Sequence, residues 1–166
     1  MAMEAFDQLI GGCAPSLLRL GVMLTGRRED AEDLLQATLL QAHRHRRRLL
    51  GMAAPTAYLR KVMVNAHLSS RRMESRRPRR IELDVVPDLA VPSEDAALDL
   101  RDEVWRLLTT LPPKQRAVLA LRYYEDLPDA EIADVLGVSA VTVRTNALRA
   151  LASLRERLAT TSEVTP

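Results

Sequence analysis

Apolar residues recur at steps of three and four along almost all of this 166-residue chain, and no segment alternates apolar and polar residues long enough to form a sheet. The sequence therefore predicts an all-α protein. One segment breaks the pattern: residues 81–98 contain Pro87 and Pro92, five acidic residues and no basic residue. Such a composition is typical of a flexible linker. We expect two small helical domains, at residues 1–80 and 99–160, joined by this acidic linker.

The two halves of the chain differ in charge. Residues 1–80 hold 15 basic and 7 acidic residues, a net charge of +8, whereas residues 81–166 hold 9 basic and 15 acidic residues, a net charge of −6. Net charges of opposite sign indicate different functions for the two halves.

The sequence also predicts where the protein works. Cys13 is the single cysteine, which excludes an intrachain disulfide and a cysteine-based zinc site and suits a reducing cytoplasm. No apolar stretch approaches the roughly 18 uncharged residues of a membrane helix, and the N-terminus lacks a basic signal-peptide start. We expect a cytoplasmic, nucleoid-associated protein without a membrane span.

The C-terminal half contains a helix-turn-helix pattern. Pro128 suits a first helical position, Gly137 permits the left-handed residue that ends a helix, and Ser139 can cap the next one. In this motif the second helix enters the major groove of DNA. The buried stripe of that helix is predicted at Val143, Ala147, Ala150, Leu154 and Leu158, and its polar face at Thr142, Arg144, Thr145 and Arg149. The alternative is an ordinary helical hairpin whose arginines are solvated. Residues 104–124 disfavour that alternative, because they add two helices that are interrupted at Pro112 and Pro113. The predicted core of these helices is Val104, Leu107, Leu108, Leu111, Val118 and Leu121.

The N-terminal half contains two informative helices. Residues 29–48 begin with acids and end with bases, an order that complements the helix dipole and needs no function to explain it. A further helix is expected from Pro55, buried along Leu59, Val62, Met63 and Ala66. Its other face carries a ring, two cations and an amide, which suit phosphates and unstacked bases. These side chains are Tyr58, Lys61, Asn65 and Arg72, and three Arg-Arg pairs at 71/72, 76/77 and 79/80 favour nucleic acid over mere solubility.

Four stretches together resemble the extracytoplasmic-function (ECF) group of bacterial RNA polymerase sigma factors, closest to an actinobacterial SigE-like subgroup. They are AEDLLQATLLQAHR (31–44), AYLRKVMVNAHLSSRR (57–72), LPPKQRAVLALRYYEDL (111–127) and IADVLGVSAVTVRTNALRAL (132–151). The resemblance covers nearly the whole chain. It implies two domains, region 2 and region 4, and a promoter-specificity subunit that binds core RNA polymerase.

The resemblance also implies roles for single residues. Asp33, Gln36 and Leu34 match positions that dock on the clamp helices of the polymerase's largest subunit, and region 4 would meet the flap of the second-largest subunit. Asn65 matches the position that receives a flipped minus 10 base, with Tyr58, Lys61 and Arg72 nearby. The minus 35 element would be read by Thr142, Arg144, Thr145 and Arg149. An anti-sigma factor is a further candidate partner.

Three departures from the family pattern bear on function. Ala37 stands where relatives commonly have an acid, Leu39 where they have phenylalanine, and Asn146 where a basic residue is frequent. The first two bear on polymerase docking and the third on minus 35 contacts.

Two other functions compete with this interpretation. A stand-alone helix-turn-helix regulator predicts tight duplex binding by the purified chain, whereas a sigma factor should bind promoters poorly without core enzyme. An enzyme is not supported, because the chain has no glycine-rich phosphate loop and no His-Glu-x-x-His motif. We expect no catalysis and no cofactor.

Overall fold

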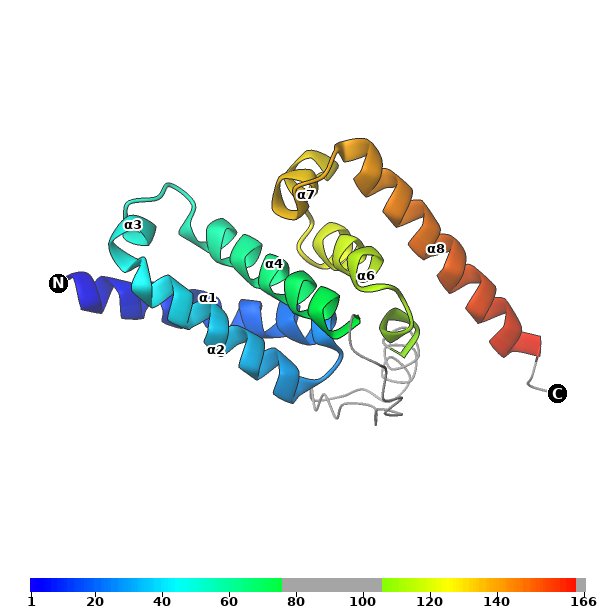
Figure 1. Ribbon diagram of the computed structural model, residues 1–166, viewed down its shortest axis with the longest axis horizontal. Helices are drawn as coiled ribbons and strands as arrows, with labels where there is room; N and C mark the ends of the chain where they lie inside the picture. The colour runs from blue at the N-terminus through cyan, green and yellow to red at the C-terminus, as the bar shows by residue number, and fades with distance from the viewer. Residues whose placement is uncertain (76–105, 164–166) are drawn as a thin grey trace. The chain divides into compact units, whose positions relative to one another are not determined.

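The computed structural model describes residues 1–75 and 106–163, and all regular structure in those ranges is helical (Figure 1). This confirms the predicted all-α class. The chain divides into two compact units, residues 1–84 and 85–166. The predicted linker at 81–98, and the Arg-Arg pairs at 76/77 and 79/80, lie outside the described residues.

The first unit is built from four helices: α1 (Ala2–Thr25), α2 (Arg28–Arg44), α3 (Arg46–Leu50) and α4 (Pro55–Ser75). α1 and α2 run antiparallel, joined by a tight turn at Gly26 (Figure 1). They approach closely at Gly21, where an added Cβ would lie 3.3 Å from the Cβ of Ala31. A larger residue at Gly21 would push the two helices apart, so this contact sets their spacing.

The core of the first unit is made of large aliphatic side chains from three helices. Leu20 of α1, Leu49 of α3, and Leu59 and Met63 of α4 are fully buried, while α2 contributes small residues such as Ala31. Burying a side chain of this size stabilises a fold by roughly 1.5–3 kcal/mol. The stripe predicted for α4 is confirmed at Leu59 and Met63, but Val62 and Ala66 are only half-buried, and Val64, His67 and Leu68 are buried in addition.

α1 is long and apolar enough to cross a membrane by length and composition, with a mean hydropathy of 1.2 over its best window. Glu4, Asp7 and Arg19 interrupt this helix, so it contains no run of about 18 uncharged residues. The helix nevertheless packs as a core element: Cys13, Leu17 and Leu20 are buried, and α1 contacts α2, α3 and α4. Its apolar character is explained by the core that it helps to form.

The helix expected over residues 29–48 is two helices. α2 ends at Arg44, His45 leaves the helical conformation at φ −112° and ψ 21°, and α3 begins at Arg46. Leu49, which follows the break, is fully buried in the core. His43 and Arg44 lie in the last turn of α2, where basic side chains complement the helix dipole as predicted.

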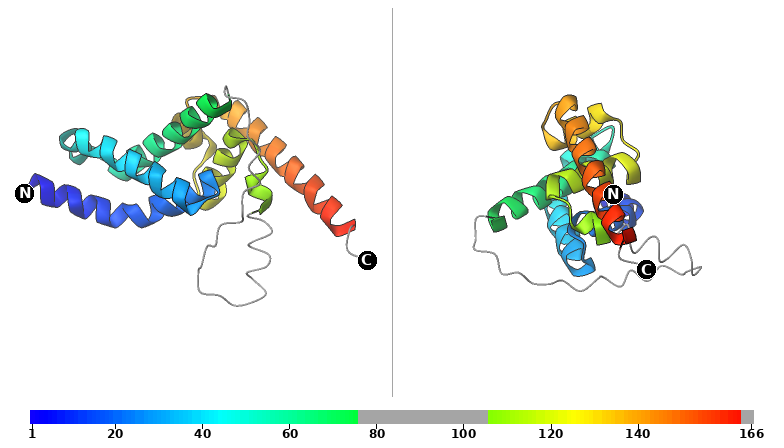
Figure 2. Two further views of the ribbon diagram at one scale, coloured as in Figure 1. Left: turned by 60° about the horizontal axis from the view of Figure 1, so that its bottom comes forward. Right: turned by 90° about the vertical axis from the view of Figure 1, so that its right-hand side faces the viewer.

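The described part of the second unit starts with helical residues 106–109. It continues as α6 (Pro113–Leu119), the π-helical turn η1 (Ala120–Tyr124), α7 (Asp129–Leu136) and α8 (Ala140–Glu163). Leu121, Ile132 and Val143 are fully buried and bring η1, α7 and α8 together. The C-terminal half of α8 extends away from α6 and α7 (Figure 2). That extension explains why Leu158, predicted in the buried stripe, is 40% exposed.

Most other core expectations for this unit are confirmed. Leu111, Val118 and Leu121 are buried, and Leu107 and Leu108 are half-buried. Val104 lies outside the described residues. Pro128 caps α7 instead of occupying its first turn, because its ψ of 157° is extended and the helix begins at Asp129.

Candidate functional site

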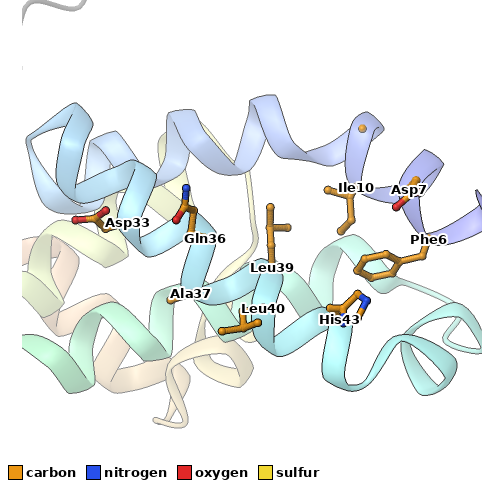
Figure 3. A pocket seen from close by; sticks show the side chains of 10 residues that line it. Phe6, Asp7, Ile10, Asp33, Gln36, Ala37, Leu39, Leu40 and His43 are labelled. Atoms are coloured by element: carbon orange, nitrogen blue, oxygen red, sulfur yellow. The ribbon is translucent and has the colours of Figure 1, made fainter. Parts of the chain in front are cut away.

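A shallow groove of about 880 Å³ runs between α1 and α2 in the first unit (Figure 3). Two of the residues predicted to dock on polymerase, Asp33 and Gln36, lie at one end of it and are exposed. Leu40, further along α2, is 57% exposed and also lines the groove. The groove therefore combines polar ends with an apolar floor, which suits a protein partner better than DNA.

The other end of the groove is closed by an aromatic contact. The rings of Phe6 and His43 meet edge to face, with centroids 5.7 Å apart and an interplanar angle of 76° (Figure 3). Edge-to-face contact is a favoured arrangement of aromatic rings. Phe6 comes from outside the quoted motif, so the motif alone could not place it in the groove.

The third predicted docking residue, Leu34, lies elsewhere. It is half-buried and lines a second hollow, between α2 and α4, together with Asp33, His67 and Arg71. Ala37 lines both hollows and Leu39 lines only the first. Both departures from the family pattern therefore line a hollow on α2.

α4 carries its four predicted side chains along one face, opposite the buried stripe. Lys61 and Arg72 are exposed, and Tyr58 and Asn65 are half-buried. The Asn65 amide donates a hydrogen bond of 2.9 Å to the Lys61 carbonyl one turn earlier. The structure thus brings together the ring, the cations and the amide on one surface, as the spacing predicted.

The helix-turn-helix of the second unit has the predicted geometry. Gly137 ends α7 in the left-handed conformation at φ 65°. The Ser139 hydroxyl accepts a hydrogen bond of 3.1 Å from the Thr142 amide, which caps the N-terminus of α8. The motif reading is confirmed at both junctions.

An ion pair that the sequence did not reveal holds α7 against the end of η1. Both Nε and a terminal nitrogen of Arg122 donate to one oxygen of Asp129, with a distance of 3.1 Å from Nε. Each side chain is 25% exposed. The Asp129 hydrogen bond raises the pKa of Arg122 further above its ordinary value, so the guanidinium stays charged. The seven-residue separation across a turn gives no periodic signal that could predict the contact.

The predicted minus 35 residues lie along the outer face of α8, but their polar groups differ in availability. Arg144 and Arg149 are exposed. The Thr142 hydroxyl lies 2.9 Å from that of Ser139, and the Thr145 hydroxyl donates to the Val141 carbonyl at 3.0 Å. Both threonine hydroxyls therefore already bond within the helix and its cap.

Asn146, the third departure from the family pattern, also bonds within α8. Its amide donates to the Thr142 carbonyl at 3.0 Å, and the side chain is half-buried. Across residues 1–75 and 106–163, no group of three His, Cys, Asp or Glu side chains is arranged to hold a metal ion.

Family models match both units. The sigma-70 region 2 model matches residues 9–77, and the sigma-70 region 4 model matches residues 101–154. The presence of both regions in one chain disfavours the stand-alone regulator, which would explain only the second.

Two relatives and one solved structure illustrate the similarity. The RNA polymerase sigma-E factor of Streptomyces avermitilis is 35% identical over 156 residues, which cover 92% of this chain and 84% of the relative. The ECF RNA polymerase sigma factor SigM of Mycobacterium tuberculosis is 34% identical over 154 residues, covering 93% and 77%. The sigma factor RpoE from Bartonella quintana, solved with the anti-sigma factor NepR, shares the fold with a TM-score of 0.72 at 22% identity, covering 97% of this chain and 98% of that chain.

The two matched regions, the relatives at about one-third identity over nearly the full chain, and the all-helical fold agree with one another. The chain belongs to the ECF group of RNA polymerase sigma factors, which direct transcription to promoters.

Proposed function

We propose that this sigma factor docks on core RNA polymerase through the groove between α1 and α2, and reads a promoter with one exposed helix from each unit. Asp33 and Gln36 would meet the clamp helices of the largest subunit, with Leu34 supporting α2 from its other side. Unit two would meet the flap of the second-largest subunit. The domain limits that we propose are 1–80 and 99–160, with a linker at 81–98.

The promoter contacts divide between the units. Asn65 on α4 receives an unpaired minus 10 base, with Tyr58 available for stacking and with Lys61 and Arg72 available for phosphates. α8 lies in the major groove of the minus 35 element, which Arg144 and Arg149 contact together with Thr142 and Thr145. The chain supplies no catalysis; polymerase carries out the chemistry. It works in the cytoplasm, at the nucleoid, where an anti-sigma factor can restrain it.

The observation that carries this proposal is the exposure of α2's polar residues beside an apolar groove. Such a surface, on the unit that lacks the helix-turn-helix, fits a protein partner in addition to DNA. Gln36 and Gln41 are both exposed residues of α2, but only Gln36 lines the groove. Gln36→Arg should therefore weaken assembly with core polymerase at least tenfold, because it introduces a large charge at the apolar contact. Gln41→Arg is the matched control and should leave assembly nearly unchanged.

Assembly is measured by titrating labelled chain with core enzyme, and function by in vitro transcription from genomic fragments. Promoter-dependent transcripts that require the chain support the proposal. Equal effects of the two arginine substitutions would show that the groove is not the docking surface, and the lack of any promoter-dependent transcript would contradict the function itself.

Base capture is tested separately. Asn65→Ala should lower the yield of open complex, measured by permanganate reactivity of unpaired thymines, more than it lowers binding to duplex promoter DNA. The reason is that base flipping costs a few kcal/mol, which contacts around Asn65 offset only after melting. Ser69→Ala, on the same face, is the control. An equal loss of duplex binding and melting would refute the capture role.

A further inference from the structure

α8 presents two exposed aliphatic side chains among its predicted DNA-contacting residues. Val141 is 63% exposed and Leu148 is 69% exposed, whereas Val143, Ala147 and Ala150 of the same helix are fully buried. The exposed pair therefore does not belong to the core.

The two aliphatic residues share the face of α8 that carries the arginines. Steps of three and four lead from Val141 to Arg144 and on to Leu148, and from Val141 through Thr145 to Arg149. Residues so spaced lie on one side of a helix. If α8 lies in the major groove with its arginines toward DNA, Val141 and Leu148 also face base edges in that groove.

Hydrogen bonds within α8 leave fewer polar side chains on this face available to discriminate bases, so its apolar side chains matter more for recognition. The hydroxyls of Thr142 and Thr145 bond to the cap and to the helix backbone, and so does the amide of Asn146. Three of the polar groups that could discriminate bases are thus engaged locally. The arginines prefer guanine edges and phosphates, so the recognition of A·T pairs falls to other side chains.

Helix formation does not explain a valine at this place. β-Branched residues are mildly unfavourable in helices, and an exposed one gains no burial to compensate. Val141 also lies two residues after Ser139, whose cap orders the first turn of α8. The N-terminal residues of a recognition helix are the ones that contact base edges.

We propose that Val141 and Leu148 are specificity-determining residues that recognise the 5-methyl groups of thymines in the minus 35 element. The proposal rests on the proposed function of α8. Apolar side chains recognise thymine through this methyl group, which only thymine presents in the major groove of unmodified DNA. Seven residues of α-helix span about 10 Å, close to three base pairs at about 3.4 Å each. The two contacted thymines should therefore lie about three base pairs apart.

The test replaces single thymines with uracil, which differs only by lacking the methyl group. A promoter is first identified by sequencing transcripts made by the reconstituted polymerase. Each minus 35 thymine is then changed in turn to deoxyuridine, and holoenzyme binding is measured. We expect about a fourfold loss at two positions, the size of effect for burying one methylene-sized group.

Truncation of the protein assigns each methyl group to a side chain. Val141→Ala should abolish the sensitivity to uracil at one position and Leu148→Ala at the other, because the partner of each methyl is gone. Leu158→Ala, which shortens a partly exposed leucine further along α8, should leave both sensitivities intact. Thermal unfolding should be nearly unchanged for the exposed pair, which excludes misfolding as the cause.

Three results would overturn the inference while leaving the sigma function in place. They are promoter binding that is indifferent to uracil, uracil sensitivity that persists in both alanine variants, and a minus 35 element with no thymine on either strand. Failure of the holoenzyme to bind any promoter would instead defeat the proposed function, and this inference with it.

Discussion

α4 and α8 carry the candidate DNA-contacting faces of the two units, yet different forces hold them in place. α4 is backed by bulky side chains, with Leu59 and Met63 fully buried against other helices. α8 is backed chiefly by small ones, such as Ala147 and Ala150. Small residues bring helices close but bury little area, so they supply less hydrophobic stabilisation for each position.

Side-chain hydrogen bonds also connect elements of the second unit. The Ser139 side chain caps α8, although α6 and α7 have no side-chain cap, which is also true of α1, α2 and α3. The Arg122–Asp129 pair then ties α7 to the preceding turn. We infer that large buried side chains position the DNA-contacting face of α4 in unit one. Specific hydrogen bonds position the DNA-contacting face of α8 in unit two.

Truncation of a buried residue in α4 should give the largest effect. Met63→Ala leaves a cavity at a fully buried site and should lower the free energy of unfolding of unit one by about 2–5 kcal/mol. Met73→Ala, on the same helix but 69% exposed, is the matched control and should change it by less than about 0.5 kcal/mol.

The measurement is urea unfolding followed by hydrogen exchange, with peptides from each unit analysed separately. Peptides of unit two should keep their protection in Met63→Ala. Similar losses for the two methionine variants would show that bulk is not what holds α4.

Sequence periodicity predicted the parts of this contrast that depend on repeated spacing. The buried positions Leu59 and Met63, the left-handed Gly137 and the Ser139 cap were all predicted, because each depends on residues within one or two helical turns. The same reasoning placed Leu158 in the core, since its spacing continues the stripe. It could not show that α8 extends past the helices that would cover that residue.

Contacts between elements could not be predicted in this way. The Phe6–His43 ring contact and the Arg122–Asp129 pair each join residues of two different helices, about which the spacing within one helix gives no information. The break at His45 was missed because the residues before and after it are both good helix formers. The burial of Leu49 across the break overrides that local preference. The candidate docking site was thus predicted on α2 but not on α1.

Loss of the ion pair should have the next largest effect. Asp129→Asn removes the charged partner of Arg122 at a site only a quarter exposed and should cost unit two about 1–2 kcal/mol. Glu131→Gln, in the same first turn of α7 but exposed, removes a similar dipole interaction without the pair and should cost only a few tenths of a kcal/mol. Thermal unfolding of unit two, followed by exchange of its peptides, distinguishes them. If both substitutions lowered the stability of unit two equally, the ion pair would contribute nothing beyond the interaction of an acidic side chain with the helix dipole.

Loss of the α8 cap should be smaller and more local. Ser139→Ala should cost about 1 kcal/mol, because the Thr142 amide loses its acceptor. Ser139→Asp retains an acceptor and should restore most of the stability. Amide exchange at Val141 and Thr142 should rise in the alanine variant only, and minus 35 binding should weaken with it. Unchanged exchange in this turn would mean that packing, and not the cap, fixes the start of α8.

The smallest effect should come from the single thiol, which lies in the bulk-supported core of unit one. Burial raises the pKa of Cys13 above its ordinary value of 9.0, since a charged thiolate would be poorly solvated there. Above about pH 9 the unfolded chain therefore binds fewer protons at this group than the folded chain does, and the stability of unit one falls as the pH rises. Cys13→Ala lacks this contribution, so its free energy of unfolding should fall less steeply between about pH 8.5 and 10. Parallel slopes for the two proteins would mean that water reaches the thiol and that the core of unit one is looser than the comparison with unit two requires.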